Sequence, residues 1–318
     1  MSNLIPLKNI SKEGIVSIRN GMKQNELSNV EIERKPEWIR LKLSENRKFN
    51  STKNRVHIRK LNTVCEEAMC PNINECWNNG TATFMLLGSV CTRACKFCSV
   101  DTGNPRGKTN DLEPINVAQS IKEMGIKYAV LTSVNRDDLN DGGANHFAKT
   151  IRAINKITPT VDIEVLCPDF KGEIGPLKTV VEFGVDVFAQ NLETVERLTR
   201  EVRDPRSGYF RTLEVLENSK RISPKVMTKT SLMLGLGETN NEIYKTIEDI
   251  RRSEVDVLTL GQYMRPTKNH LPVKRWVKPT EFRDLKNFSE SLGFKMVFSG
   301  PLVRSSYRAD LLQKHLNK

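Results

Sequence analysis

The chain has 318 residues, of which 38% are hydrophobic and 28% are charged, so it can bury a sizeable core. No stretch approaches the roughly 20 apolar residues that span a bilayer, and residues 1–20 lack the apolar block of a secretory signal. These features exclude a helical membrane protein and predict a cytoplasmic one. The 50 Lys and Arg residues exceed the 38 Asp and Glu residues, and the resulting net charge of +12 suits nucleic acid, an acidic carrier protein or simply a solvated basic face.

The first sixty residues are polar and basic and contain few apolar runs, so we expect an N-terminal extension over 1–60. The segment 61–82 follows and carries three cysteines. From residue 83 onward, short apolar runs typical of buried strands alternate with stretches of helical spacing. The six expected strands are 83–87, 128–132, 161–166, 185–189, 230–234 and 255–260. The expected helices are 117–124, 144–154, 177–183, 213–220 and 242–250.

This alternation of strands and helices indicates parallel βαβ units. We therefore predict an α/β fold, a partial (β/α)6 TIM-like barrel over 83–290 with N-terminal and C-terminal extensions, the latter over 291–318. An open doubly wound sheet has the same periodicity and remains the alternative. In both arrangements the reactive groups lie at the carboxyl ends of the strands, and the first expected strand leads almost directly to Cys91.

Six of the seven cysteines fall between residues 65 and 98, a clustering that points to metal or redox chemistry in a cytosolic chain. Cys91, Cys95 and Cys98 form a CxxxCxxC motif. Three thiolates on one short loop can hold three irons of a four-iron cluster and leave the fourth iron open to a substrate. A structural zinc ion normally has a fourth protein ligand and CxxC pairs, so zinc is the weaker interpretation.

A second cysteine triplet precedes the first, with Cys65, Cys70 and Cys76 in a CxxxxCxxxxxC spacing. Two triplets predict two clusters, and the alternatives for this second triplet are buried structural cysteines or further zinc ligands. Cys167 stands alone at the end of an expected strand, so we expect it in the core rather than at a metal.

The CxxxCxxC motif resembles the signature of the radical S-adenosylmethionine superfamily. Together with the CxxxxCxxxxxC motif and with Arg304-Ser305-Ser306-Tyr307, it resembles the lipoyl synthase family within that superfamily. The resemblance extends through 136–144, 191–195 and 202–206 and covers about 62–309. Under this resemblance, 61–82 is an auxiliary iron-sulfur segment and 83–290 is the radical S-adenosylmethionine barrel.

The resemblance implies two 4Fe-4S clusters per chain. The catalytic cluster, which also binds S-adenosylmethionine, would have the ligands Cys91, Cys95 and Cys98. The ligands of the auxiliary cluster would be Cys65, Cys70, Cys76 and Ser306. Ser305 remains an alternative to Ser306, and either serine could instead cap a helix that begins near residue 307.

Contacts with S-adenosylmethionine are implied, less specifically, for several polar or glycine positions near the strand ends. These positions are Gly142, Gly143, Asn191, Glu193 and Arg203. A glycine pair is more often an ordinary turn, and a polar residue after a strand is more often a surface residue or a helix cap.

The activity implied by the resemblance is that of a sulfurtransferase, which inserts two sulfur atoms at C6 and C8 of a protein-bound octanoyl-lysine and sacrifices the auxiliary cluster. The implied partners are octanoylated carrier domains, such as the glycine cleavage H protein and 2-oxoacid dehydrogenase acyltransferase subunits, and a one-electron reductant such as ferredoxin or flavodoxin. Neither a membrane nor nucleic acid is expected. The alternatives are a radical enzyme that modifies transfer RNA and a zinc-stabilised nucleic-acid-binding protein, although no appended nucleic-acid module is visible.

Overall fold

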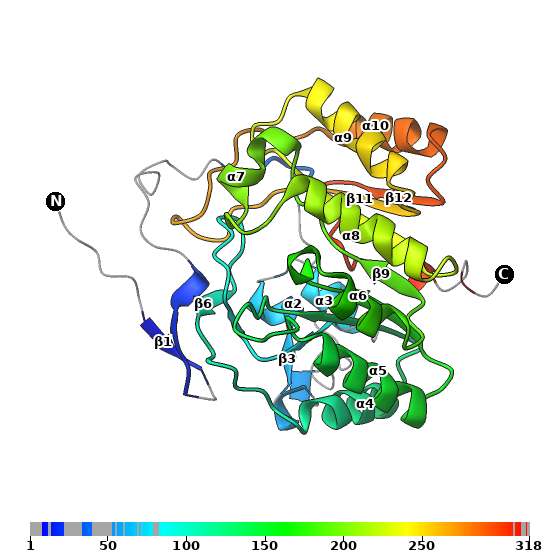
Figure 1. The fold of residues 1–318 in the computed structure, drawn as a ribbon. Helices are drawn as coiled ribbons and strands as arrows, with labels where there is room; N and C mark the ends of the chain where they lie inside the picture. The colour runs from blue at the N-terminus through cyan, green and yellow to red at the C-terminus, as the bar shows by residue number, and fades with distance from the viewer. Residues whose placement is uncertain are drawn as a thin grey trace.

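A central sheet flanked by helices organises the chain in the computed structural model (Figure 1). The structure describes residues 8–11, 14–21, 34–39, 53–54, 56–59, 61–68, 70, 72–78, 83–307, 309–312 and 316. Much of the expected extension 1–60 therefore lies outside the described residues. Within them, no helix has the length and apolar character needed to cross a membrane.

The central sheet has eight strands in the order β12-β11-β10-β9-β8-β7-β4-β3. They are β3 (Asn62–Thr63), β4 (Thr83–Leu86), β7 (Tyr128–Ser133), β8 (Asp162–Leu166), β9 (Val187–Ala189), β10 (Met227–Leu234), β11 (Val257–Gln262) and β12 (Met296–Ser299). All neighbours from β4 to β12 pair in parallel, and β3 pairs antiparallel with β4. The parallel strands follow chain order without reversal, whereas a doubly wound sheet reverses at a switch point. The partial barrel is thus confirmed.

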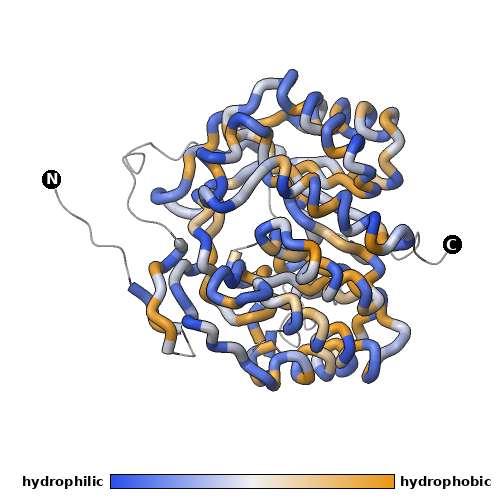
Figure 2. Tube along the Cα trace, in the orientation of Figure 1, coloured by the Kyte–Doolittle hydropathy of each residue, from blue (hydrophilic) through white to orange (hydrophobic). Residues whose placement is uncertain are grey.

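Helices connect successive parallel strands. They are α4 (Glu113–Met124), α5 (Ala144–Ile157), α6 (Ile174–Val181), α7 (Thr199–Val202), α8 (Tyr209–Ile222), α9 (Asn240–Arg252) and α10 (Pro279–Ser291). Figure 2 shows hydrophobic and hydrophilic residues alternating along the outer helices, as expected for helices with one face on the sheet and one in water. The strand β12, which continues the sheet into 291–318, was not predicted because it is short and only partly buried.

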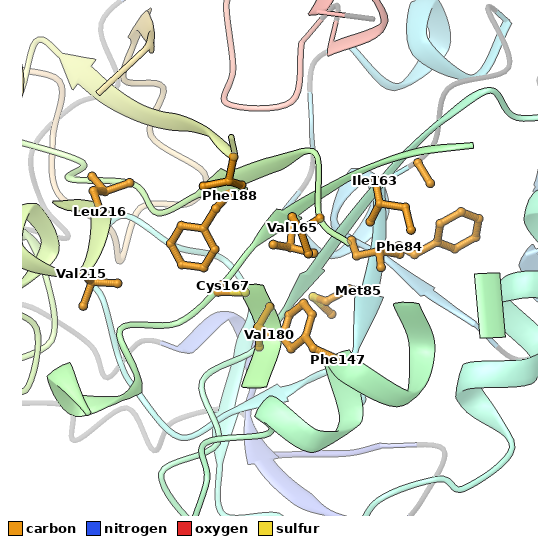
Figure 3. Close-up of a cluster of buried hydrophobic side chains, with 14 of the residues drawn as sticks. Phe84, Met85, Phe147, Ile163, Val165, Cys167, Val180, Phe188, Val215 and Leu216 are labelled. Carbon is orange, nitrogen blue, oxygen red and sulfur yellow. The ribbon is translucent and has the colours of Figure 1, made fainter. Parts of the chain in front are cut away.

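The main core lies between the sheet and this layer of helices (Figure 3). Ile163 and Val165 of β8 and Phe188 of β9 point toward side chains of the helices, which include Phe147 of α5 and Val180 of α6. Alternation along each strand sends the intervening residues to the other face. Cys167 is 5% exposed and belongs to the core, as expected.

A buried ion pair occupies the inner face of the strands. Lys229 Nζ of β10 lies 2.9 Å and 3.0 Å from the two carboxylate oxygens of Glu164 on β8, and the Tyr128 hydroxyl donates to the same carboxylate at 2.7 Å. All three side chains are buried, so each charge has a partner where an unpaired one would be costly. The barrel interior is therefore filled by side chains at this level and is not an open pore.

A small second sheet joins the N-terminal region to the CxxxCxxC loop. Its strand order is β1 (Lys8–Ile10), β2 (Val16–Ile18), β6 (Asp101–Gly103) and β5 (Val90–Cys91), and η1 (Arg19–Gly21) follows β2. Asp101 accepts hydrogen bonds from Asn9 Nδ2 at 2.7 Å, from Ser17 Oγ at 3.1 Å and from the Asn20 N–H at 2.8 Å. The cysteine loop is thus framed by β5 and β6, and the N-terminal strands brace it.

Candidate active site

A cavity of about 390 Å³ lies at the carboxyl ends of the barrel strands. Residues of both cysteine triplets line it, together with the C-terminal serines and two residues that follow β9. These residues are Cys65, Cys70, Cys76, Cys98, Ser305, Ser306, Asn191 and Glu193. Segments more than 200 positions apart in the sequence therefore meet at one site. This site lies at the carboxyl ends of the strands, where the sequence predicts the reactive groups.

The backbone of the CxxxCxxC loop is held by three loops that follow barrel strands. The Thr92 N–H donates to the Asn135 carbonyl at 2.9 Å, and the Lys96 N–H donates to the Val202 carbonyl at 2.9 Å. The Lys96 carbonyl in turn accepts from the Leu271 N–H at 3.3 Å. The loops after β7, β9 and β11 thus fix the positions of the three cysteines relative to the barrel.

The thiols of the CxxxCxxC motif are largely shielded from water, and backbone N–H groups contact two of their sulfur atoms. Burial raises the pKa of Cys95 to about 11 and raises the pKa values of Cys91 and Cys98 as well. The Arg93 N–H lies 3.4 Å from Cys91 Sγ, and the Asp204 N–H lies 3.3 Å from Cys95 Sγ. An N–H that donates to sulfur favours the thiolate over the thiol, and the thiolate is the form that binds iron.

The three cysteine sulfurs of this motif fit an iron-sulfur cluster. Three thiolates are the soft ligands that such a cluster prefers, and Asn191 Oδ1 is buried at the cavity without a hydrogen-bond partner among the described residues. The described part of the chain has no group of three or more His, Cys, Asp or Glu residues suited to one metal ion. A four-iron cluster places its cysteines on separate irons, so they need not converge on a point.

The second triplet lies on two short helices before β4. Cys65 belongs to α2 (Val64–Glu67) and Cys76 to α3 (Ile73–Asn78), and the Cys70 N–H between them donates to the Cys65 carbonyl at 3.1 Å. Burial raises the pKa of Cys65 to about 11 and raises that of Cys70, although the nearby charge of Arg304 opposes the shift at Cys70.

The C-terminal segment folds back onto this triplet. Asn72 Nδ2 donates to the Leu302 carbonyl at 2.7 Å, and the Tyr307 hydroxyl donates to Glu75 Oε1 at 3.2 Å. Ser305 and Ser306 occupy a turn closed by the Tyr307 N–H on the Arg304 carbonyl at 3.0 Å. Neither serine side chain has a hydrogen-bond partner in the described part of the chain, and the next helical turn, η5, spans Ala309–Leu312.

The residues expected to contact S-adenosylmethionine separate into two groups. Asn191 and Glu193 line the cavity, and Glu193 adopts a φ of 71°, a left-handed conformation that is uncommon for non-glycine residues. Burial raises the pKa of Glu193. Arg203 lies behind them, where it donates to the Leu192 carbonyl at 3.3 Å and to Thr212 Oγ1 at 3.0 Å.

Gly142 and Gly143 do not line this cavity. Gly142 faces a smaller pocket, of about 10 Å³, on the other side of the cysteine loop. Gly143 is the N-cap residue that precedes α5 and has a φ of 94°, and a Cβ there would lie 2.3 Å from Leu87 Cδ1. The requirement for glycine at this position is thus explained by a turn and by close packing.

Sequence reasoning did not assign a role to His270, which is buried beside the cysteine loop. Its Nε2 donates to the Cys98 carbonyl at 3.0 Å, and its Nδ1 lies 2.8 Å from Thr267 Oγ1. Arg93, Asp137 and Asp204 support the same loop through hydrogen bonds and ion pairs. Arg93 lies within the cysteine motif, and Asp137 and Asp204 lie in 136–144 and 202–206, and only these positions in the sequence hinted at such roles.

Comparison with known proteins agrees with this geometry. Residues 85–250 match the family model of the Radical SAM superfamily. Methylornithine synthase has a similar fold, with a TM-score of 0.52 and 12% identity over 67% of this chain and 69% of that one. The FeFe-hydrogenase maturase HydG from Carboxydothermus hydrogenoformans aligns with a TM-score of 0.51 and 14% identity over 73% and 65%. Partial barrel and cysteine loop together define a radical S-adenosylmethionine enzyme, a class whose members carry a 4Fe-4S cluster.

Relatives from several bacteria specify the family within this class. A lipoyl synthase of Ectopseudomonas mendocina (strain ymp) is 55% identical over 94% of this chain and 85% of that protein. Lipoyl synthases of Legionella pneumophila (strain Corby) and Francisella tularensis subsp. novicida (strain U112) are 54% and 52% identical over 96% and 98% of this chain, and over 93% and 94% of their own lengths. The chain belongs to the lipoyl synthase family.

Proposed function

We propose that the enzyme inserts sulfur at C6 and C8 of an octanoyl group carried on a lysine of a carrier domain. The observation that carries this proposal is that Cys98 of the CxxxCxxC motif, all three cysteines of the second triplet and the C-terminal serines line one cavity. One triplet suffices to cleave S-adenosylmethionine, so a second one facing the same space supports a role in the same reaction. A volume of about 390 Å³ also lies in the range of small-molecule sites.

The chain's residues would hold the two clusters and position the reactants. Cys91, Cys95 and Cys98 would bind the catalytic cluster, which supplies the electron that cleaves S-adenosylmethionine to a 5'-deoxyadenosyl radical. Asn191 and Glu193 would offer polar contacts to S-adenosylmethionine, and Arg203, Gly142 and Gly143 would act by positioning the loops around it. The apolar side chains of Phe97, Leu232 and Met233 line the same cavity and would exclude water from the radical.

The auxiliary cluster would be held by Cys65, Cys70, Cys76 and Ser306, and it would supply the sulfur atoms. Serine is a harder ligand than thiolate and binds iron of such clusters less tenaciously, which suits a cluster that is consumed. Ser305 lines the same cavity and remains the alternative ligand. Because 291–318 contributes both β12 and these serines, we propose that this extension and 61–82 work with the barrel over 83–290 as one catalytic unit.

The partners would be octanoylated lipoyl carrier domains, such as the glycine cleavage H protein and 2-oxoacid dehydrogenase acyltransferase subunits, and a one-electron reductant such as ferredoxin or flavodoxin. The test is anaerobic reconstitution followed by iron and sulfide analysis and single-turnover mass spectrometry of an octanoyl-lysine peptide. We expect about eight irons and eight sulfides per chain, from two four-iron clusters, and a lipoyl product. Bound zinc, or 5'-deoxyadenosine without sulfur insertion in the fully reconstituted chain, would contradict the proposal.

A further inference from the structure

A third hollow lies on the outer side of the cysteine loop. It is an open groove of about 860 Å³ between the loop, α7 and the start of α8. Six basic residues line it, against two acidic ones, Asp137 and Glu196. The basic residues are Arg93, Lys171, Arg197, Arg200, Arg206 and Arg211.

Part of this charge is neutralised within the protein and part is not. Arg93 and Arg206 pair with Asp137, and Arg197 pairs with Glu242 on α9. Lys171 and Arg200 are exposed and have no ion-pair partner among the described residues. The groove therefore presents uncompensated positive charge to the solvent.

An exposed aromatic side chain lies among these charges. Phe210, at the start of α8, is 64% exposed and lines the groove. Aromatic and arginine residues are the types enriched in protein interfaces. Phe210 and the basic residues without ion-pair partners therefore form a surface suited to contact with an acidic protein.

The groove wall is connected to the cysteine loop by short hydrogen bonds. Arg206 Nη2 donates to the Thr92 carbonyl at 2.7 Å, and Arg206 Nε donates to the Asp204 carboxylate at 2.8 Å. The Asp204 N–H then reaches Cys95 Sγ at 3.3 Å. A molecule bound in the groove is thus separated from Cys95 by two residues.

None of the residues that line the groove also lines the cavity of about 390 Å³. An acyl chain on a docked carrier needs an opening into that cavity, whereas an electron needs only a short path to the cluster. The groove geometry therefore favours a partner that delivers electrons over one that delivers the substrate.

We propose that this groove is the docking surface for a small acidic protein that carries a one-electron donor. The proposal rests on the proposed function, because it assumes a catalytic cluster on Cys91, Cys95 and Cys98. One electron leaves the donor, which is oxidised by one equivalent, and reduces that cluster, with no bond formed or broken in the transfer. Encounters of this kind bury little surface, below about 1,200 Å², and depend on charge for their association rate.

The test compares two electron sources for the cleavage of S-adenosylmethionine by the reconstituted enzyme. Reduced flavodoxin must dock, whereas dithionite is a small molecule and needs no protein interface. For Lys171→Glu/Arg200→Glu we expect 5'-deoxyadenosine formation to fall about tenfold at subsaturating flavodoxin, because charge reversal removes the steering. The rate with dithionite should not change. Phe210→Ser should also raise the flavodoxin concentration needed for half-maximal rate.

The matched control is Lys156→Glu/Lys225→Glu, which makes the same charge change at exposed positions near the amino ends of β8 and β10. We expect no specific loss with flavodoxin. An equal loss in this control, or an unchanged flavodoxin rate in Lys171→Glu/Arg200→Glu, would overturn the proposal, as would a defect confined to the octanoylated carrier. Failure of the unaltered enzyme to form 5'-deoxyadenosine with dithionite would instead contradict the proposed function itself.

Discussion

The backbone N–H of Asp204 donates to Cys95 Sγ at 3.3 Å, although the two residues are 109 positions apart. The Asp204 carboxylate also accepts from the Ala94 N–H at 2.9 Å, on the residue before Cys95. Asp204 thus fixes the cysteine loop and favours negative charge on one of its sulfurs. Arg206 holds the carboxylate in place from the groove side.

Replacing this carboxylate should weaken cluster binding without unfolding the barrel. For Asp204→Ala we expect iron to be lost to a chelator about 10 to 100 times more readily, the range typical when a residue that supports a metal ligand is removed. The rate of bleaching of the iron-sulfur absorbance under anaerobic conditions measures this. Asp111→Ala, at an exposed position before α4, is the control and should bleach at the unaltered rate.

The two triplets should be separable by mutation. Cys91→Ala/Cys95→Ala/Cys98→Ala should lose about half of the iron and all 5'-deoxyadenosine formation, because only this triplet would activate S-adenosylmethionine. Cys65→Ala/Cys70→Ala/Cys76→Ala should lose the other half, keep 5'-deoxyadenosine formation and make no carbon-sulfur bond. Mass spectrometry of an octanoyl-lysine peptide distinguishes the two. Lipoyl product from the second variant without added sulfide would rule out the donor role.

Gly261 should prove essential to the position of the C-terminal serines. A Cβ at this position on β11 would lie 2.1 Å from the Val303 carbonyl oxygen, so Gly261→Ala must displace the segment that carries Ser306. We expect this variant to lose auxiliary iron and lipoyl product while it retains 5'-deoxyadenosine formation. Gly300→Ala is the matched control, because its Cβ would make only an ordinary contact of 3.5 Å with Val303 Cγ2. Equal loss in both variants would refute this role of Gly261.

The sequence predicted the local features of the site more fully than the contacts between distant segments. The apolar runs were long enough to reveal β4 and β7 to β11, whereas the short strands β1, β2, β3, β5 and β6 were not predicted, and each cysteine triplet is local. The approach of Val303 to Gly261 and the hydrogen bond from His270 to Cys98 depend instead on how loops after different strands meet. No periodicity encodes such contacts. The Gly142-Gly143 pair was ambiguous for the same reason, because a glycine required by packing against Leu87 has the same sequence as one that contacts a ligand.

Asp256 should make the stability of the fold depend on pH in acid. Its buried carboxylate accepts hydrogen bonds from Lys220, from the Thr228 N–H at 3.0 Å and from Lys295 at 2.9 Å. Burial raises the pKa of Asp256, but these partners outweigh it and lower the pKa below the usual value. A lowered pKa means that the carboxylate stabilises the folded chain above its unfolded pKa of about 4. That stabilisation is lost as the pH falls below 4 through the folded value.

For Asp256→Ala we expect a loss of about 3 kcal/mol in the free energy of unfolding at pH 7, as for other broken buried pairs. The difference from the unaltered chain should shrink as the pH falls below about 4. Denaturant unfolding of the cluster-free chain at several pH values measures both effects. A difference that stays constant down to the lowest pH would show that lost packing, not charge, is responsible.

The carrier should dock at the rim of the cavity formed by the loop after β11. Met264, Arg265 and Pro266 of this loop line the cavity, and the exposed Lys268 and Lys274 follow within ten residues. Attraction between this basic rim and an acidic carrier would mainly raise the association rate and would weaken with salt. We therefore expect rising ionic strength to slow conversion of the whole carrier more than that of a short octanoyl-lysine peptide.

Charge reversal at the rim tests this docking directly. Lys268→Glu/Lys274→Glu should raise the KM for the octanoylated carrier about tenfold and leave the KM for the peptide unchanged, because the peptide reaches the cavity without covering the rim. Lys156→Glu/Lys225→Glu again supplies the control at the opposite end of the sheet. Equal salt dependence of the two substrates would remove the argument for docking. Efficient conversion of free octanoate would go further, since it would show that the carrier's lysine linkage is not what the enzyme recognises.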